Sequence, residues 1–294
     1  MRIQLFISSL LLLFFSACEE SFDLKLRSIE FVVIDGFISN QAGFTQVRLT
    51  FSSNFNSNAI NKPINDAQVY VVSNEREYAR LTEVQNSGIY TPEDVNFITD
   101  PQISYWIEID INDKKYASKP VQSLASASYS IIIEEETKIR VNSALNTVSE
   151  SGYNISTRLL PKETNEILAS HFKWEWLGWY IDPSTNEVIF ERPTNYVNII
   201  KSDELDDRTN FYIDFQVKSA LPNSDYNLVV IQKAMTQDAF NYWTAIKNQI
   251  DVSGTFFDGQ PETILGNVFS SDSTEIVLGY VLVGDVKVNT RKLN

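Results

Sequence analysis

The chain has 294 residues, and its 38 acidic against 24 basic side chains give a formal net charge of −14 at pH 7. Such a charge opposes binding to nucleic acids and to anionic lipid head groups, so neither is expected as a partner. With a single cysteine the chain can form no internal disulfide, and the fold must rely on its hydrophobic core alone.

The first 17 residues have the three zones of a secretory signal peptide. Arg2 supplies a positive n-region, residues 5–15 form an almost wholly apolar h-region, and the small residues Ser16 and Ala17 follow. As a helix the apolar run rises about 16 Å, roughly half of a hydrocarbon core, so it is too short to span a membrane. No later stretch approaches roughly 18 consecutive apolar residues, so the sequence predicts a mature chain that crosses no membrane.

The cysteine directly follows the signal peptide, in the segment Phe15-Ser16-Ala17-Cys18. This segment resembles a bacterial lipobox, whose cysteine is diacylated on sulfur, becomes the new N-terminus and is acylated again. Leu is commoner than Phe at the first position. Each buried CH₂ of a palmitate-like chain contributes about 0.8 kcal/mol, so an acylated Cys18 would anchor a soluble domain stably. The alternative is a signal peptide that is cut elsewhere and carries an incidental cysteine.

Three acidic residues, Glu19, Glu20 and Asp23, follow the cysteine within a tether that we predict over residues 18–27. In Bacteroidota, an acidic stretch at this place resembles the signal that sends lipoproteins to the outer leaflet. The alternative is an ordinary solvated tether. We therefore expect a lipid-anchored protein of the outer membrane, exposed on the cell-surface leaflet.

Beyond the tether, apolar and polar residues alternate with a period of two, which is typical of strands with one buried face. Between residues 45 and 52, Val47, Leu49 and Phe51 share one face. The same pattern recurs in residues 105–111, in residues 153–159, and at Phe211, Ile213, Phe215 and Val217. Short alternating segments separated by Asn, Asp, Gly and Pro predict an all-β fold of antiparallel sheets.

The length favours two β domains, with one large β domain as the alternative. The best boundary is the small-residue, polar stretch "KPVQSLASAS" (residues 119–128), which lies between strand-like runs. Ahead of it, about six strands are enough for a small Ig-like sandwich over residues 28–122. Beyond it, a larger β domain over residues 123–294 contains a segment with helical periodicity.

An aromatic, strand-like segment, "HFKWEWLGWY" (residues 171–180), holds three of the five tryptophans. Phe172, Trp174 and Trp176 share one face. Trp179 and Tyr180 follow Gly178, where the strand can end. Buried, these side chains form the core of the second domain, which we favour because soluble proteins rarely expose large apolar patches. Exposed, they could stack on sugar rings or dock a partner. The candidate binding aromatics are Trp174, Trp176, Trp179 and Tyr180.

The only histidine, His171, would have to serve any Ser-His-Asp or Cys-His site, and the only cysteine is assigned to lipidation. We expect His171 to be a surface or half-buried strand residue, facing opposite Phe172 and Trp174. No HExxH, CxxC, P-loop or GxSxG motif occurs. Hydrolysis by a carboxylate pair stays open, because spacing selects no pair among 38 acids. We expect no enzymatic activity and no cofactor.

Two acidic stretches offer oxygen ligands for calcium, "DPSTNE" (residues 182–187) and "SDELDD" (residues 202–207). The first does not fit an EF-hand, because Pro193 stands where the twelfth position needs a bidentate Glu. It is more simply a hairpin turn, with Pro183 at its second position. We expect both stretches to be solvated loops and the chain to hold no metal.

The segment "TQDAFNYWTAIKNQI" (residues 236–250) has the periodicity of an amphipathic helix. Its apolar stripe consists of Ala239, Phe240, Trp243, Ile246 and Ile250. Thr236 can cap the N-terminus, Asp238 suits that positive end, and Lys247 suits the other end. We predict a helix over residues 237–250 whose aromatic stripe packs on a sheet; a ligand role for the stripe is the alternative.

Four segments carry a family resemblance. "EFVVIDGFISN" (residues 30–40) looks like a first strand of the form VV-x-G-x-I soon after a lipidated cysteine, and "INDAQVYV" (residues 64–71) looks like the next recurrent strand. Residues 236–249 are similar to the helix, and residues 266–286 to a closing GN-[IV] … LGYF segment, with Val281 where Phe is usual. The chain thus resembles a Bacteroidota lipoprotein family catalogued as a domain of unknown function, number 4249, most strongly at its C-terminus.

The resemblance implies an outer-membrane lipoprotein with a β-rich fold, of a kind often encoded near TonB-dependent transporters. It brings no catalytic residues with it. We therefore expect a non-catalytic accessory or ligand-handling partner of such a transporter or of another outer-membrane complex. The alternative is a structural or adhesive β module at the cell surface without a transporter partner. The sequence names no ligand.

Overall fold

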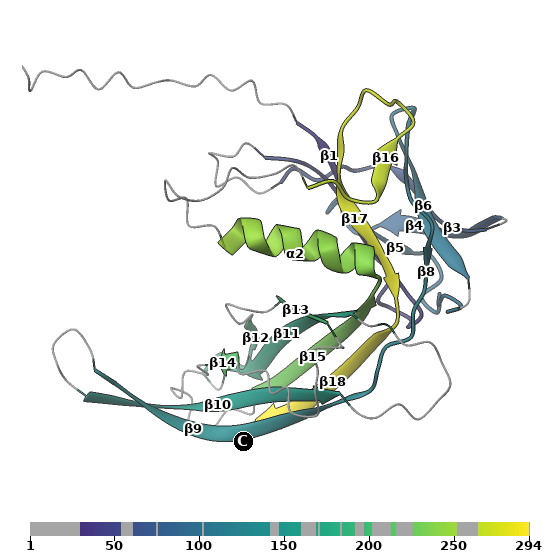
Figure 1. The fold of residues 1–294 in the computed structure, drawn as a ribbon. Helices are drawn as coiled ribbons and strands as arrows, with labels where there is room; N and C mark the ends of the chain where they lie inside the picture. The colour runs from purple at the N-terminus through teal and green to yellow at the C-terminus, as the bar shows by residue number, and fades with distance from the viewer. Residues whose placement is uncertain are drawn as a thin grey trace, which may run out of the picture. The chain divides into compact units, whose positions relative to one another are not determined.

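The computed structural model describes residues 30–53, 61–74, 76–101, 103–141, 147–159, 169, 171–182, 184–191, 197–201, 213–215, 226–251 and 264–293. The contacts within the chain divide it into two compact units, Met1–Glu30 and Phe31–Asn294. The second unit contains the strands and the helix described below. Strands make up most of the described part of this unit, and helix α2 (Gln237–Asp251) lies near its C-terminus (Figure 1). The β-rich class and the C-terminal helix are therefore confirmed.

Ten strands join in one hydrogen-bonded sheet. They are β1 (Val32–Ser39), β2 (Gln46–Phe51), β3 (Gln68–Ser73), β4 (Arg76–Glu83), β5 (Ile89–Pro92), β6 (Ser104–Ile111), β7 (Lys114–Ser118), β8 (Val121–Gln122), β16 (Val268–Ser270) and β17 (Val277–Gly284). Their order is β16-β7-β6-β3-β4-β5-β2-β1-β17, with β8 paired to β6. β1 and β17 run parallel, which corrects the expectation of purely antiparallel pairing.

Two smaller sheets hold all the other described strands. A five-stranded sheet contains β11 (His171–Ile181), β12 (Val188–Glu191), β13 (Val197–Lys201), β15 (Tyr226–Met235) and β18 (Val286–Leu293). A three-stranded sheet contains β9 (Tyr129–Val141), β10 (Thr147–Leu159) and β14 (Ile213–Phe215). The middle of the alternating run at residues 211–217 is thus a strand, and its outer members Phe211 and Val217 lie outside the described residues.

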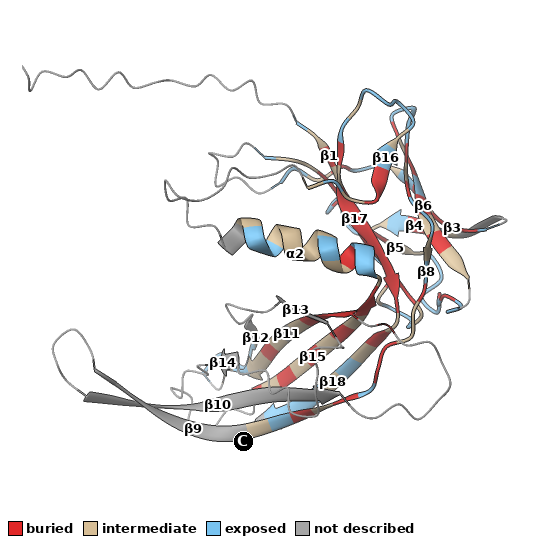
Figure 2. Ribbon diagram, viewed as in Figure 1, coloured by how far each residue is buried: buried red, intermediate tan, exposed pale blue. Residues whose placement is uncertain are grey.

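The alternation of apolar residues gives the ten-stranded sheet one buried face. In β6, Tyr105, Ile107 and Ile109 are buried while Glu108 between them is exposed. Buried side chains of β1 to β7, β16 and β17 belong to a single hydrophobic cluster, so the sheet curves around a shared core. Figure 2 shows β17 buried along nearly its whole length. The period-two pattern therefore predicted this core correctly.

The division into two domains at residues 122 and 123 is not confirmed. β16 and β17 come from the C-terminal end of the chain, yet they pair with β7 and β1. The expected linker is also packed: Ser123, Ser126 and Ala127 are buried. The Gln232 side chain donates hydrogen bonds to the Ser126 hydroxyl and the Ala127 carbonyl, and Ser126 N–H donates to Asp285 at 2.9 Å. Buried polar groups of this kind fix the segment in place.

Helix α2 begins as its sequence predicts. The Thr236 hydroxyl accepts a hydrogen bond from Ala239 N–H at 3.3 Å, and Asp238 lies in the first turn. The helix ends at Asp251 and has no basic residue in its last turn, so Lys247 does not neutralise that end as expected. Ala239 is fully buried in a cluster with side chains of β1, β15, β17 and β18, and Phe240 and Trp243 are half-buried against it, so the aromatic stripe packs on the sheets. The burial of Ile250 lies outside the described residues. In the described ranges, no helix is long and apolar enough for a membrane span.

Candidate functional site

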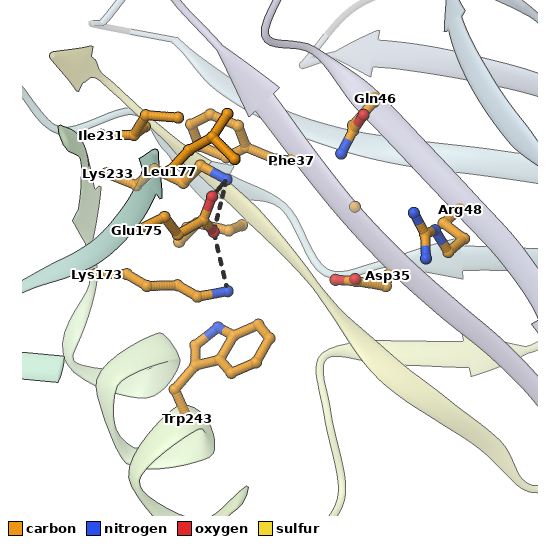
Figure 3. Close-up of a pocket in the computed structure, with 12 residues that line it drawn as sticks. Asp35, Phe37, Gln46, Arg48, Lys173, Glu175, Leu177, Ile231, Lys233 and Trp243 are labelled. Atoms are coloured by element: carbon orange, nitrogen blue, oxygen red, sulfur yellow. Dashed lines mark hydrogen bonds and ion pairs between the residues drawn. The ribbon is translucent and has the colours of Figure 1, made fainter. Parts of the chain in front are cut away.

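A cavity of about 290 Å³ lies where β1, β2 and β17 face β11, β15 and α2 (Figure 3). Its polar lining consists of Asp35, Gln46, Arg48, Lys173, Glu175 and Lys233. Its apolar lining consists mainly of Phe37, Leu177, Ile231, Trp243 and Leu282. A concave site with an apolar lining and a few convergent polar groups is the usual form of a small-molecule site.

Strand alternation places the charged residues of β11 in this cavity. Phe172 and Trp174 point into one hydrophobic cluster, so Lys173 and Glu175 lie on the opposite face of the strand. Lys173 is directly opposite Lys233 on β15. Like charges in that position repel each other. Glu175, two residues further along the same face, provides the compensating charge.

The three charged groups form a compact triad. Lys233 Nζ donates to both carboxylate oxygens of Glu175, at 2.9 and 3.0 Å, and Lys173 Nζ lies 3.4 Å from Oε1. Burial acts to raise the pKa of Glu175, but the attraction of Lys233 and Lys173 outweighs it and holds that pKa below its usual value. Burial lowers the pKa of Lys173, and Glu175 opposes this shift. With both lysines protonated, the triad carries two cations and one anion.

Aromatic rings complete the surroundings of both lysines. Lys173 Nζ lies 3.4 Å from the centre of the Trp243 ring, and Lys233 Nζ lies 4.8 Å from the centre of the Phe37 ring. Such cation–π contacts favour the charged forms. Figure 3 shows the indole nitrogen of Trp243 on the side of the ring nearest Lys173. This Nε1–H is buried and has no acceptor among the residues that the structure describes.

The opposite wall of the cavity belongs to the ten-stranded sheet. Asp35 on β1 and Arg48 on β2 are paired directly across the two strands, and both are exposed. Figure 3 shows their charged groups directed into the cavity, with Asp35 on the side of Lys173. The lining as a whole carries three cations and two carboxylates, which leaves one net positive charge. The cavity is therefore locally positive in a chain whose net charge is −14.

The residues predicted as a site of binding aromatics lie in different environments in the structure. Trp174 is 1% exposed and meets Tyr129 edge to face, with ring centres 4.6 Å apart, so it belongs to the core. Trp179 is half-buried, and Tyr180 is half-buried with its ring stacked on Tyr226. The side chain of Trp176 lies outside the described residues. β11 also continues past Gly178 to Ile181, so the strand does not end at the glycine.

His171 is buried, at 2% exposure, which corrects the expectation of a surface or half-buried residue. Its ring lies 4.5 Å from that of Phe240, because α2 covers this end of β11. Burial between a strand and a helix makes His171 part of the packing. It does not line the cavity.

Asp182 and residues 184–187 lie in a turn between β11 and β12, as the sequence predicted. Asp182 N–H donates to the Glu187 carbonyl, and Asp182 accepts hydrogen bonds from Ser184 N–H and its hydroxyl. Those bonds from Ser184 lower the pKa of the Asp182 carboxyl. Across the described ranges, no group of three or more His, Cys, Asp or Glu side chains could hold a metal ion. Pro183 and residues 202–207 lie outside the described residues.

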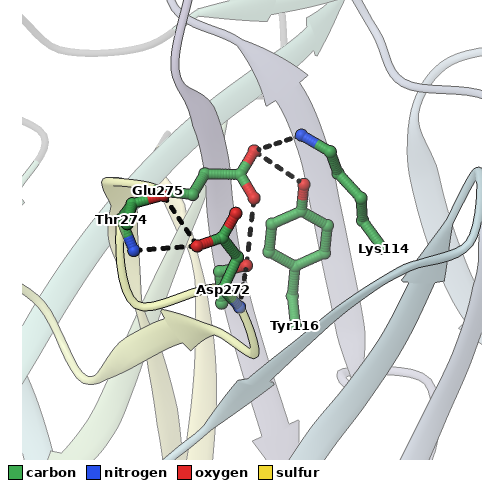
Figure 4. Close-up of polar contacts among 6 residues, drawn as sticks. Lys114, Tyr116, Asp272, Thr274 and Glu275 are labelled. Carbon is green, nitrogen blue, oxygen red and sulfur yellow. Dashed lines mark hydrogen bonds and ion pairs between the residues drawn. The ribbon is translucent and has the colours of Figure 1, made fainter.

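A second polar cluster fastens the β16–β17 connection to β7 (Figure 4). Glu275 accepts hydrogen bonds from Lys114 Nζ at 3.0 Å, the Tyr116 hydroxyl at 3.1 Å and the Ser270 hydroxyl at 3.0 Å. Burial and Glu275 raise the pKa of Tyr116 to about 12. Glu275 is thus bonded to β7 and to β16 at once, so the cluster holds the connection in place. The cavity beside the triad, with its buried charged side chains, is the candidate site.

Sequence reasoning did not identify the residues of the triad. The signal was present, because Lys173 and Glu175 alternate with aromatic residues in a strand whose neighbours are apolar. Trp243 was predicted only as a member of the apolar stripe of the helix, for which a ligand role was the alternative. Lys233 and Asp35 gave no signal, since only tertiary packing brings them to β11. Cys18, Glu19, Glu20 and Asp23, the proposed lipidation site and export signal, lie outside the described residues.

Comparison with functionally curated proteins gave no match. A family model does match the chain, over residues 19–290, which is nearly all of the sequence beyond the predicted signal peptide. The match includes every strand that lines the cavity as well as helix α2. The chain therefore belongs to the family described as a domain of unknown function, DUF4249.

Proposed function

We propose that this protein is a non-catalytic, lipid-anchored protein of the outer membrane that binds a small ligand in the cavity between its sheets. In this proposal it serves as an accessory, ligand-handling partner of a TonB-dependent transporter or of another outer-membrane complex. The observation that carries the proposal is the cavity of about 290 Å³ with its buried Lys173–Glu175–Lys233 triad. Its volume is close to the lower end of typical ligand sites, about 300 Å³.

The chemistry of the triad supports binding over catalysis. Glu175 is engaged by two ammonium groups, and its lowered pKa makes it a poor proton acceptor at neutral pH. Each lysine is in turn held by a carboxylate and an aromatic ring. Groups fixed in this way are suited to orienting a bound molecule, since no member of the triad is free to accept a proton.

The predicted membrane anchor supports a role beside a partner in the outer membrane. One wall of the cavity belongs to the ten-stranded sheet and the other to β11 and β15, so a ligand would contact both sheets. The predicted lipid anchor and acidic tether precede β1 in the sequence. An acyl chain at Cys18 would keep the binding unit close to the membrane, where a transporter partner resides.

The proposal is tested by isolating the full chain from its native membranes in a mild detergent and identifying co-purifying proteins by mass spectrometry. We expect a TonB-dependent transporter or another outer-membrane complex with the wild-type protein. The matched control is Cys18→Ala, which should leave the membrane fraction or stall as a precursor and lose that partner. Recovery of the wild-type chain without any outer-membrane protein, together with affinity for a matrix or glycan, would favour the structural or adhesive alternative instead.

A further inference from the structure

We propose that the ligand of the cavity is an organic monoanion, a carboxylate with an apolar body, bound with its charged group between Lys173, Lys233 and Trp243. This inference rests on the proposed function, because it names the class of ligand that the same cavity would bind. It is carried by three independent features of the cavity, which are its net charge, an unused buried donor and the division of its lining into polar and apolar parts.

The first feature is the charge balance. With its ionisable groups charged, the lining carries one positive charge in excess, and the side chains of Lys173 and Lys233 are largely shielded from water. A buried charge without a partner is unfavourable, and a single negative charge on the ligand would compensate it. A cationic ligand would add to the excess, and a neutral ligand would leave it in place.

The second feature is the set of available donors. Lys233 Nζ is already shared between the two oxygens of Glu175, whereas Lys173 Nζ makes only the longer contact of 3.4 Å with that carboxylate. Beside it, the buried Trp243 Nε1–H has no acceptor among the described residues. A buried donor without an acceptor costs free energy, and a carboxylate oxygen would supply the acceptor.

The third feature is the remainder of the lining. Phe37, Ile231 and Leu282 offer only apolar contacts, and Leu177 extends this surface along β11. A ligand whose only polar group is the anion would bury its body against these side chains. Inorganic phosphate has no such body, so it should bind more weakly than an organic carboxylate.

The test compares three probes of one shape in ¹⁹F NMR of the full chain in detergent: 4-fluorobenzoate, 4-fluorobenzamide and 4-fluorobenzylamine. We expect line broadening on protein addition for the benzoate alone, reversed by unlabelled benzoate and poorly by inorganic phosphate. Preference for the benzylamine or the benzamide overturns the inference, as does broadening of none of the three probes. The comparison uses wild-type protein only, so it does not depend on the folding of a variant.

Two cavity variants then test the site. Lys233→Met should bind 4-fluorobenzoate about 10- to 100-fold more weakly, because the variant removes one of the two ammonium charges beside the bound carboxylate. Glu175→Gln keeps the shape of the side chain and removes a negative charge, so it should bind the benzoate more tightly. If Glu175 served only to hold the two lysines in place, Glu175→Gln would instead bind the benzoate more weakly than wild type. Lys119→Met, on an exposed lysine away from the cavity, is the control for the change in net charge and should bind as wild type.

The outcomes separate this inference from the proposed function. Benzylamine binding that is lost when Asp35 is replaced by Asn would contradict the ligand class while leaving a ligand-binding cavity. Wild-type affinity in both Lys233→Met and Glu175→Gln would move any benzoate binding away from the cavity and overturn the inference. The co-purification experiment is independent of both results, because it identifies the protein partner without reference to the ligand.

Discussion

Trp174 shows how a single side chain of β11 supports the fold behind the cavity. Its ring is fully buried against Tyr129, whose hydroxyl donates to the Val230 carbonyl at 2.6 Å. Trp174→Ala should therefore lose about 3–5 kcal/mol of unfolding free energy, the usual range for a buried aromatic residue. Trp179→Ala is the matched control and should lose clearly less, because Trp179 is half-buried. Chemical denaturation of both variants measures the difference, and equal losses would contradict the assignment of Trp174 to the core.

Glu175 should make the stability of the protein depend on acid pH. Burial opposes its ionisation, but the two lysines hold the folded-state pKa below the usual 4.5. A carboxylate of this kind stabilises the fold above its unfolded pKa, and the contribution disappears as the pH falls through the folded pKa. Glu175→Gln should thus be less stable than wild type at pH 7, where Lys173 and Lys233 would then repel each other.

The difference in unfolding free energy between wild type and Glu175→Gln should narrow as the pH falls from about 4.5 to the folded pKa of Glu175. In this range the unfolded wild-type chain binds a proton at Glu175 and the folded chain does not yet do so. Urea unfolding at a series of pH values from neutral to acidic measures this difference. Glu187→Gln, on an exposed turn, is the control and should follow the wild-type profile. A difference between Glu175→Gln and wild type that stays constant with pH would contradict the ion-pair geometry.

At the scale of the elements, the parallel pair β1–β17 requires a glycine at position 279. Gly279 has a φ of +114°, and a Cβ there would lie 1.9 Å from the Ile34 carbonyl oxygen of β1. Gly43 also has a positive φ, +82°, but a Cβ there would meet nothing within 4 Å. Gly43→Ala should lower the free energy of unfolding by about 1–2 kcal/mol, which is the cost of the left-handed backbone conformation alone. Gly279→Ala should cost more, because the two strands must also move apart; equal losses in thermal melts would contradict the pairing.

The elements were predictable to different degrees. Alternation identified the buried residues of β2 and β6, and the Thr236 cap with the apolar stripe identified α2, because these signals are local in sequence. The parallel pairing of β1 with β17 was not predictable, since the two strands are far apart in the chain and alternation does not specify a partner. The cavity depends on that same long-range pairing. Lys173 and Glu175 could have been noticed in an aromatic strand, but their meeting with Lys233, Asp35 and Trp243 could not.

At the scale of the whole molecule, the C-terminal strands complete the N-terminal sheet. Val277, Val281 and Val283 of β17 lie in the same hydrophobic cluster as β1 and β2. A fragment of residues 28–122, the first domain predicted from the sequence, would lack β16 and β17 and expose the edges of β1 and β7. We expect this fragment to show no cooperative thermal unfolding, whereas the full chain does. A cooperative transition in the isolated fragment would support the two-domain division.

The central claim is that the cavity between β1, β11, β15 and α2 binds a small organic anion, and a crystal structure with 4-bromobenzoate tests it most directly. The anomalous signal of bromine locates the probe without any assumption about its pose. We expect one bromine site against Ile231 and Leu282, with the carboxylate between Lys173, Lys233 and Trp243 Nε1. Bromine bound only elsewhere, with ordered water alone beside the triad, would contradict the account.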